Sequence, residues 1–287
     1  MNPTEKVIAT LSYVQKFSGQ TILVKLGGAA LQSAELVDSI CEDLHHIRSV
    51  GVNVVLVHGG GPLINQELTA RGIQWQFIDG QRVTTPEMME VIEMVLCGLV
   101  NRRFVRALNK AGVRAVGMSG SDAGTLTCRQ ASAQLGQVGQ INKVDTTIIH
   151  SILKDGIPVI APIGVGSAGE AFNINADWAA SMIAQALGIK KVLFLTDQDG
   201  ILDRDSKLIQ EIDAAELENL IDTGVVTGGM LAKTQTVLSA LRNGVSDVHI
   251  ANARRPHALI EELFTDGGVG TICRLRSRVS IGPGTAD

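Results

Sequence analysis

The chain has 287 residues, 45% of them hydrophobic and 19% charged, and its formal net charge is −4. This acidic balance, with only six Phe, two Trp and one Tyr available to stack on bases, argues against a nucleic-acid-binding surface. The four cysteines are far apart and form no C-x-x-C pair, and we expect neither a secretory leader nor a membrane span. A cytoplasmic protein with free thiols is therefore predicted.

The first predicted element is a helix within residues 1–20. Apolar residues recur at helical spacing, from Val7 through Leu11 and Val14 to Phe17. From this pattern alone we expect the helix to pack on its own domain, and the alternative is that it reaches to another subunit.

The first core strand is predicted at residues 21–26, and it ends at the pair Gly27 and Gly28. Lys25 interrupts the apolar run of this strand, and a lysine in a core normally needs an anion beside it. Because glycine has no Cβ, the backbone N–H groups of the turn can approach a ligand closely and hold an anion. This pattern predicts a phosphate-binding strand end, and the alternative is an ordinary turn whose lysine extends to water.

A second strand, predicted at residues 52–57, leads into His58, three glycines and Pro62. Proline suits the first turn of a helix, and the free N–H groups and dipole at that helix start create a second anion site. We interpret His58 as a hydrogen-bonded structural residue rather than as an acid or base.

A hairpin and a long helix come next. The Asp79-Gly80 turn predicts a hairpin, in which Arg82 is either a solvated charge or, if the hairpin folds over the glycine turns, a clamp for a carboxylate. Residues 85–112 are predicted to form the helix. A strand at 113–118, a β excursion at 125–142, a helix at 145–154 and a strand at 157–163 are expected to follow.

Residues 164–169 match the dinucleotide motif G-x-G-x-x-G, but no helix is predicted to open at the last glycine. We therefore do not expect a nicotinamide cofactor. Three polar residues in five positions, Asn173, Asn175 and Asp177, then precede a helix, which is more than a helix cap requires.

In the last third of the chain a strand is predicted at 191–197, and the acidic residues 203–205 do not have the spacing of a calcium loop. A glycine loop then opens a helix whose Lys233 can point toward the glycine turns, and the alternative is a plain surface lysine. A strand at 245–250, a helix around 257–264, a strand at 268–273 and a frayed tail over the last dozen residues are expected after it.

The alternation of strands and helices predicts an α/β fold, a three-layer sandwich around a mainly parallel central sheet, with ligands at the carboxyl ends of the strands. At this length we expect one large sheet that serves two lobes. Two glycine anion sites and two lysines, without a nucleophile triad or a metal cluster, suggest phosphoryl transfer. The sequence lacks the Walker motif G-x-x-x-x-G-K-[ST], so this kinase would be of another design.

Five motifs, in order, resemble those of the N-acetylglutamate kinases in the amino acid kinase family, over about residues 7–275. They are K-L-G-G at 25–28, H-G-G-G-P at 58–62, G-Q-R-V-T at 80–84, N-I-N-A-D at 173–177, and G-M at 229–230 with Lys233. The resemblance implies transfer of the ATP γ-phosphate to the side-chain carboxylate of N-acetyl-L-glutamate, the second step of arginine synthesis. It also implies that Mg²⁺ is held mainly by the phosphates, with no metal ligands from the chain.

The resemblance further implies roles for single residues. Lys25 and Lys233 would neutralise charge on the transferring phosphoryl group, and Asp177 would position both lysines. Acetylglutamate would be bound by the backbone N–H groups of Gly60 and Gly61, by Arg82 at its α-carboxylate and by Asn173 near its acetamido group. The phosphates and the nucleotide would be bound by Gly27, Gly28, Thr196, Asp197 and Met230. A glutamate carboxylate, with a pKa near ~4.3, is ionised at pH 7, so no general base is needed.

Residues 11–17 resemble the N-terminal helix of the arginine-inhibited members, which interlaces dimers into a hexamer, a trimer of dimers. This resemblance favours an intersubunit role for the helix over packing within the domain. It implies an arginine effector site at Tyr13, His249, Glu262 and Gly268. The division expected is an oligomerisation arm at 1–20, an acyl-amino-acid-binding lobe at 21–170 and a nucleotide-binding lobe at 171–287.

The chain departs from the family pattern at Ser121, Ala232 and Gln198. These departures leave open a related acceptor, an aminoadipate derivative or glutamate itself. A third alternative is a non-catalytic amino-acid sensor of the same fold. Retention of both Lys25 and Lys233 favours the kinase over the sensor.

Overall fold

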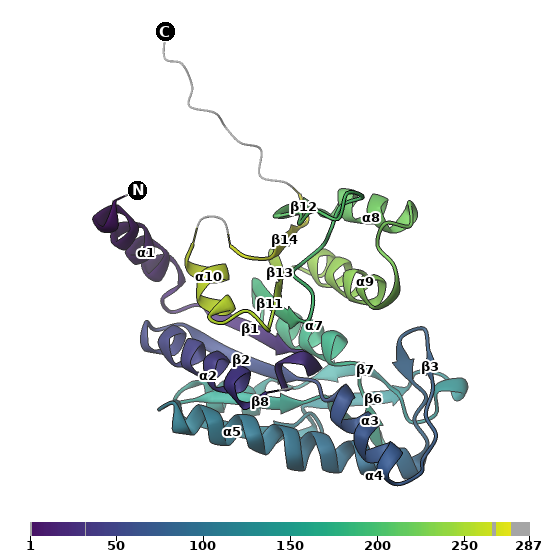
Figure 1. Ribbon diagram of the computed structural model, residues 1–287. Coiled ribbons are helices and arrows are strands. Elements are labelled where there is room, and N and C mark those ends of the chain that lie inside the picture. Colours follow the sequence, from purple (N-terminus) through teal and green to yellow (C-terminus); the bar gives the residue numbers. More distant parts are fainter. Residues whose placement is uncertain (1, 32, 266–267, 277–287) are drawn as a thin grey trace.

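The computed structural model describes residues 2–31, 33–265 and 268–276. The predicted frayed tail lies mostly outside these described residues. The strands of the central sheet are β1 (Thr21–Leu26), β2 (Asn53–His58), β5 (Ala115–Ser119), β8 (Ile157–Ala161), β11 (Lys191–Thr196), β12 (Glu211–Asp213), β13 (Asp247–Asn252) and β14 (Thr271–Arg274). Their order is β12-β14-β13-β11-β1-β2-β8-β5, and every neighbouring pair is parallel except β13 with β14 (Figure 1).

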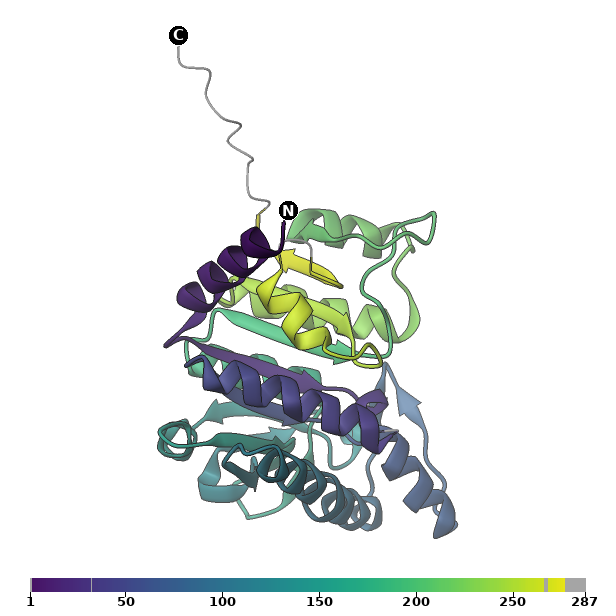
Figure 2. The same ribbon diagram turned by 60° about the vertical axis from the view of Figure 1, so that its left-hand side comes forward.

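Helices cover both faces of this sheet (Figures 1 and 2). One face carries α2 (Ala34–Ser49), α3 (Gly61–Ala70), α4 (Pro86–Glu93), α5 (Asn101–Lys110) and α10 (Ala258–Phe264). The other carries α6 (Thr147–Leu153), α7 (Ala176–Ala186), α8 (Ala214–Asp222) and α9 (Gly228–Arg242). In β1, Ile22 and Val24 join the first buried cluster and Leu23 the second, because successive side chains of a strand point to opposite faces. The predicted three-layer α/β sandwich around a mainly parallel sheet is confirmed.

The predicted β excursion is a second, smaller sheet. It contains β6 (Leu126–Gln130), β7 (Gly139–Val144), β9 (Ile163–Val165) and β10 (Ala171–Asn173), in the order β10-β9-β6-β7. The glycine-rich residues 164–169 connect β9 to β10, and no helix opens at the last glycine. The interpretation that this match is not a dinucleotide fingerprint agrees with that connection.

Two further features position the site. A hairpin of β3 (Phe77–Ile78) and β4 (Gln81–Arg82) projects beside α3 (Figure 1). The long predicted helix is present, and between α4 and α5 it widens into a π-helical segment, η2 (Met94–Val100). Short 3-10 segments occur at η1 (Gly28–Leu31), η3 (Asp122–Gly124) and η4 (Ala133–Leu135).

The N-terminal helix α1 (Pro3–Phe17) leaves the body of the molecule beside α10 (Figure 2). Its last residue, Phe17, is buried, and its ring centroid lies 5.9 Å from that of Phe264 in an edge-on arrangement. Ile8 and Leu11, nearer the start, are 58% and 54% exposed. The carboxyl end of α1 therefore packs on its own domain, while its amino half presents apolar side chains to the outside.

Candidate functional site

Two lysines and one aspartate meet at the carboxyl end of the central strand. Lys25, the fifth residue of β1, places its Nζ 2.7 Å from Oδ1 of Asp177, in the first turn of α7. Lys233, one turn into α9, places its Nζ 2.8 Å from Oδ2 of the same carboxylate. All three side chains are nearly buried, with exposures of 8%, 13% and 11% respectively. The anion that a buried Lys25 requires is thus Asp177, and Lys233 is not a plain surface lysine.

The charges in this cluster shift the pKa values of its members. Burial lowers the pKa of Lys25, while Asp177 partly offsets this effect. Burial also opposes ionisation of Asp177, but the two ammonium groups outweigh it and hold the pKa of this carboxyl below its usual range. Asp177 is therefore an anion at neutral pH, shared between the two lysines.

The first glycine turn needs one correction to the sequence interpretation. The N–H of Gly27 is not free, because it donates to the carbonyl of Leu195 in β11 at 2.8 Å. A Cβ at Gly27 would lie 2.9 Å from that carbonyl oxygen, and one at Gly28 would lie 2.5 Å from Pro62. Glycine is thus required here for close packing, and Gly27 can offer a ligand a close approach but no N–H donor.

The second glycine turn supplies the N–H groups that were predicted. The N–H of Gly59 donates to the carbonyl of Leu26 at 2.9 Å, which extends the sheet by one bond. Gly60 is the N-cap of α3 and Gly61 its first residue, and no side chain caps this helix. The first N–H groups of a helix have no partner within it, so those of Gly60 and Gly61 are available to an anion.

A cavity of about 170 Å³ lies over the second glycine turn. It is lined by Gly59, Gly60, Gly61, Ile64, Phe77, Gly80, Gln81, Arg82, Leu96, Val138, Pro162, Asn173, Ile174, Asn175 and Ala176. The four residues predicted to bind acetylglutamate are thus brought together around one space. The hairpin does fold over the glycine turn, as the clamp interpretation of Arg82 required.

Arg82 is held in place by groups that the sequence analysis did not identify. Its Nη2 donates to Oδ1 of Asn65 in α3, and its guanidinium carbon lies 5.2 Å and 4.7 Å from the ring centroids of Trp75 and Phe77. Its Nη1 is buried without a hydrogen-bond partner among the described residues. A fixed guanidinium with one unused N–H pair suits a carboxylate ligand. Burial lowers the pKa of Arg82 from its usual value, but an arginine remains charged at neutral pH.

The three polar residues at and just before the start of α7 have three separate tasks. Asn175 is the helix cap, accepting from the N–H groups of Asp177 and Trp178. Asn173 donates from Nδ2 to Oγ1 of Thr84 at 3.1 Å and lines the cavity. Asp177 holds the lysines. A cap therefore accounts for one of the three, as expected.

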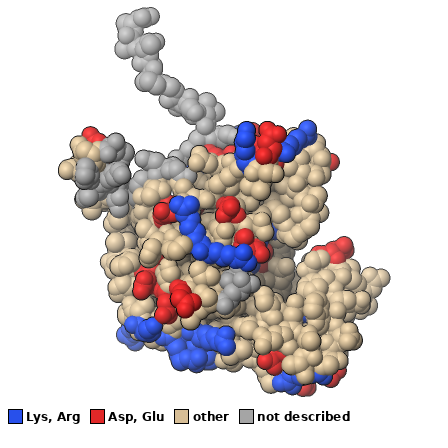
Figure 3. Space-filling model, in the orientation of Figure 1, with Lys and Arg blue, Asp and Glu red and all other residues tan. Residues whose placement is uncertain are grey.

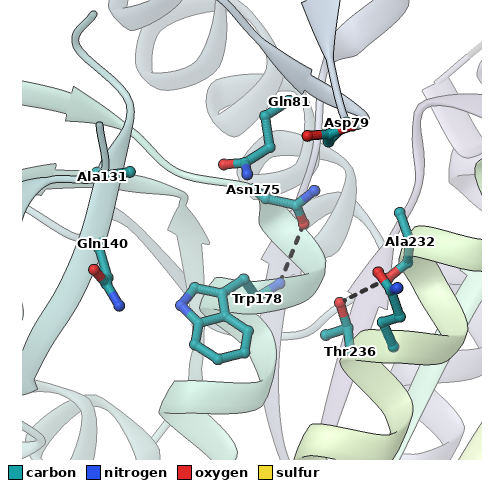
Figure 4. Close-up of a pocket in the computed structure, with 10 residues that line it drawn as sticks. Asp79, Gln81, Ala131, Gln140, Asn175, Trp178, Ala232 and Thr236 are labelled. Carbon is teal, nitrogen blue, oxygen red and sulfur yellow. Dashed lines mark hydrogen bonds between the residues drawn. The ribbon is translucent and has the colours of Figure 1, made fainter. Parts of the chain in front are cut away.

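A second cavity of about 330 Å³ adjoins the first, and Gln81 and Asn175 line both. Figure 4 shows Asn175 and Trp178 on α7 across from Ala232 and Thr236 on α9, with Asp79 and Gln81 of the hairpin closing one side. In the space-filling view the surface is hollowed between the hairpin and α9 (Figure 3). The hollow leads from solvent toward the elements that carry Asp177 and Lys233.

The residues predicted to contact the nucleotide lie along the ends of β11 and α9. Thr196 ends β11 and is nearly buried, and its Oγ1 donates to Oδ1 of Asp197 at 3.2 Å. Met230 lies in the first turn of α9, which no side chain caps. Because β11 pairs in parallel with β1, Thr196 and Asp197 lie at the same edge of the sheet as Lys25. Among the described residues, no group of three or more His, Cys, Asp or Glu side chains is placed to hold a metal.

Three of the four predicted effector positions meet in a buried polar chain at the other end of the sheet. Nδ1 of His249 lies 2.5 Å from Oε1 of Glu262, and Nε2 lies 2.8 Å from Nζ of Lys191. Gly268 has a φ of +55°, and a Cβ there would lie 2.7 Å from Oε2 of Glu262. Tyr13 lies in α1, but its side chain is outside the described part of the structure.

Burial sets the charge states of these polar side chains. Burial lowers the pKa of His249, which therefore stays neutral at pH 7. Burial also opposes ionisation of Glu262, but His249 and the N–H groups of Val269 and Gly270 together outweigh it and lower the pKa of the carboxyl. Lys191, also with a lowered pKa because of burial, lies 5.1 Å from the ring centroid of Phe17 in α1. The end of α1 is thus connected to the buried carboxylate of Glu262 through Lys191 and His249.

The sequence profile of the amino acid kinase family matches residues 20–252. The chain belongs to the amino acid kinase family. Proteins named acetylglutamate kinase from Vesicomyosocius okutanii and Ruegeria sp. are both 44% identical to this kinase, over 92% and 94% of its length and 89% and 95% of theirs. The corresponding protein of Clostridioides difficile is 45% identical over 93% of this chain and 96% of its own. The kinase is thus a phosphotransferase with a carboxyl group as its acceptor, and the predicted family is confirmed.

Solved structures agree with the family. N-acetylglutamate synthase from Neisseria gonorrhoeae, complexed with coenzyme A and N-acetyl-glutamate, matches with a TM-score of 0.87 at 25% identity, over 96% of this kinase. The kinase spans 64% of that longer chain. An isopentenyl phosphate kinase matches with a TM-score of 0.62 at 19% identity, over 88% of this kinase and all of that chain, and shares the fold alone.

In the described residues of the kinase no helix has the length and apolar character needed to span a bilayer.

Proposed function

We propose that this protein transfers the γ-phosphoryl group of ATP to the side-chain carboxylate of N-acetyl-L-glutamate, giving N-acetylglutamyl phosphate and ADP, the second step of arginine biosynthesis. The observation that carries the proposal is the buried Lys25–Asp177–Lys233 cluster beside the cavity that holds Arg82 and the Gly60–Gly61 turn. Relatives with this activity in their names match along nearly the whole chain.

The chemistry needs charge neutralisation and positioning more than proton transfer. An oxygen of the acceptor carboxylate attacks the γ-phosphorus, the bond from that phosphorus to the β–γ bridging oxygen breaks, and ADP leaves with the electron pair. No proton is transferred, because a carboxylate is already ionised at pH 7. Lys25 and Lys233 face the developing charge on the phosphoryl group, and Asp177 fixes both ammonium groups before the reaction begins.

The acceptor is oriented by groups at the two ends of the cavity. The α-carboxylate pairs with the fixed guanidinium of Arg82, whose Nη1 is buried and unpaired among the described residues. The side-chain carboxylate lies against the N–H groups of Gly60 and Gly61, and Asn173 holds the acetamido end. A short acyl amino acid with two carboxylates fits this arrangement.

The nucleotide completes the site from the other side. Gly28 and the uncapped start of α9 receive the phosphates, and Thr196, Asp197 and Met230 contact the nucleoside. Asp177 is already engaged by two lysines, so the described residues fit a Mg²⁺ ion that arrives on the phosphates. When bound there, the ion neutralises phosphate charge. The residues would divide into an acyl-amino-acid-binding lobe at 21–170 and a nucleotide-binding lobe at 171–287.

The decisive experiment measures ADP release with Mg-ATP and N-acetyl-L-glutamate, beside parallel reactions with glutamate and aminoadipate. Hydroxylamine traps the acyl phosphate as a hydroxamate. Signal that depends on acetylglutamate is expected. Signal with only another acid would move the enzyme to a related acceptor, and no signal from folded protein that binds ATP would favour a non-catalytic sensor.

We also propose that L-arginine inhibits the enzyme and that α1 joins dimers into a hexamer, a trimer of dimers in the cytoplasm. The end of α1 packs on Phe264 of α10, the helix that carries the buried Glu262, and the exposed Ile8 and Leu11 offer an apolar surface to another subunit. Added arginine should raise the acetylglutamate concentration needed for half-saturation. An unchanged saturation curve, or a monomer by sedimentation, would contradict the respective part.

A further inference from the structure

The proposed mechanism gives no task to the buried histidine beside the second glycine turn. His58 ends β2 with no exposed surface, directly before the glycine turn. Its Nδ1 lies 3.0 Å from the carbonyl oxygen of Gly59, and its Nε2 lies 3.1 Å from Nδ2 of Asn101, which is also fully buried. Asn101 is the first residue of α5, directly after the π-helical segment. No signal in the sequence links these two residues, which are 43 positions apart.

The neighbours of Asn101 determine which ring nitrogen of His58 carries the proton. Nδ2 of Asn101 lies 2.8 Å from the carbonyl oxygen of Val159 and 3.3 Å from that of Met118, and carbonyls only accept. Oδ1 of Asn101 accepts from Nη2 of Arg102 at 2.7 Å. The amide nitrogen therefore faces His58, and Nε2 of the ring must accept. The proton is on Nδ1, which donates to the carbonyl of Gly59.

This bond fixes the orientation of one peptide group. In a trans peptide the C=O of one residue and the N–H of the next point in opposite directions, and the described residues contain no cis peptide. The carbonyl of Gly59 is held toward the buried ring, so the N–H of Gly60 points away from it, on the side of the substrate cavity that Gly60 lines. The peptide group before it is also fixed, because the N–H of Gly59 donates to the carbonyl oxygen of Leu26 at 2.9 Å.

We propose that Asn101 and His58 form a positioning pair that aims the N–H of Gly60 at the reacting carboxylate. The proposal rests on the proposed function, because it assigns the Gly60 N–H to the acceptor. The pair touches neither substrate, and it acts only through the Gly59–Gly60 peptide.

The surroundings of the pair keep this arrangement constant with pH. Burial lowers the pKa of His58 to about 4, and the nearby Arg102 acts in the same direction. The ring therefore stays neutral at physiological pH, with one tautomer selected by Asn101. The π-helical segment closes the other side of the turn, because a Cβ at Gly60 would lie 2.6 Å from Leu96 and 3.4 Å from Val100.

The test compares three variants of the full chain. His58→Leu removes the donor to Gly59, His58→Asn keeps an N–H near the position of Nδ1, and Phe104→Leu is the control. The ring of Phe104 packs 5.9 Å from that of His58 but makes no bond to the glycine turn, so this control loses packing alone. Initial rates give kcat and KM for each substrate, and ¹H–¹⁵N spectra follow the Gly60 amide as acetylglutamate is added.

We expect His58→Leu to lower kcat/KM for acetylglutamate by about tenfold to hundredfold, as for other small misplacements of binding groups, with the KM for ATP unchanged. His58→Asn should recover most of that loss. The Gly60 amide should shift on acetylglutamate binding in the wild type and less in His58→Leu. Equal kinetics for His58→Leu and Phe104→Leu, with only a lower melting temperature, would overturn the proposal.

The proposal can still be tested if His58→Leu does not fold or if the proposed function is wrong. If His58→Leu does not fold, ¹⁵N shifts of the wild-type histidine still decide, since a proton on Nε2 or a titration near neutral pH would refute the pair. If the wild type itself does not phosphorylate acetylglutamate, the proposed function fails instead. The tautomer of His58 and its bond to Gly59 can then still be measured.

Discussion

Replacing Lys233 by methionine tests the central claim that this lysine acts on the transferring phosphoryl group. Methionine keeps much of the buried volume and removes the charge. Lys25 stays 2.7 Å from Asp177, so the carboxylate keeps a partner when its 2.8 Å contact to Lys233 is lost. Loss of one fixed group facing a developing negative charge typically costs about 3 kcal/mol in the transition state, which corresponds to a kcat about 10²–10³-fold lower.

The assay is hydroxamate formation under saturating ATP, with acetylglutamate binding measured separately by calorimetry. Lys233 does not line the cavity assigned to acetylglutamate, so the dissociation constant should change by less than about threefold. Lys110→Met is the matched control, because Lys110 forms a 2.7 Å pair with Asp38 on the surface with 73% of its side chain exposed. A loss in kcat below about tenfold, or an equal loss of acetylglutamate binding, would refute the assignment.

Four other changes have defined outcomes. Gly60→Ala should raise the KM for acetylglutamate without changing the KM for ATP in initial-rate assays, because its Cβ would lie 2.6 Å from Leu96. Arg82→Met should raise the same KM by about tenfold to hundredfold through loss of a charge-assisted bond, with little change for ATP. Asp43 raises the pKa of His257. This pair therefore stabilises the fold fully below about pH 6.5, and its contribution is lost as pH rises through the folded pKa. The melting temperature of His257→Gln should fall further below that of the wild type at pH 5.5 than at pH 8.5. The pKa of Asp177 is lowered, so its contribution is present above about pH 4 and is lost as pH falls further, and the stability deficit of Asp177→Asn should shrink in acid.

The fold could be predicted from local patterns because each core element carries its own signal. Residues 21–26 show the apolar run of a buried strand, and Pro62 marks the start of α3. The helix α8 was missed although it begins with a readable capping box, in which Asp213 and Glu216 bond each other's backbone N–H groups. The helix has only nine residues, so its apolar residues span less than three turns and give a short periodic signal.

The site was less accessible to residue-level reasoning because its contacts join distant parts of the chain. Lys233 and Asp177 are 56 positions apart, and neither residue alone indicates the other. The site assignment came from the order of five motifs, and the family comparison bears out the family that this order implied. One contact could have been found from local geometry: a two-residue Asp79-Gly80 turn places Phe77 opposite Arg82, so an aromatic ring beside the guanidinium follows from the hairpin register.

The buried cluster of Lys25, Asp177 and Lys233 carries a net positive charge at the end of a core strand. Two ammonium groups share one carboxylate, and Asp197 adds only a smaller attraction to Lys25. Taking this charge out of water costs free energy that the contact with Asp177 recovers only in part, since burial lowers the pKa of Lys25 despite this partner. In the proposed reaction, a phosphate between the lysines would add negative charge, and the charge that develops on the phosphoryl oxygens during transfer would add more. On this proposal, the excess positive charge of the cluster would favour nucleotide binding, and the transition state still more strongly.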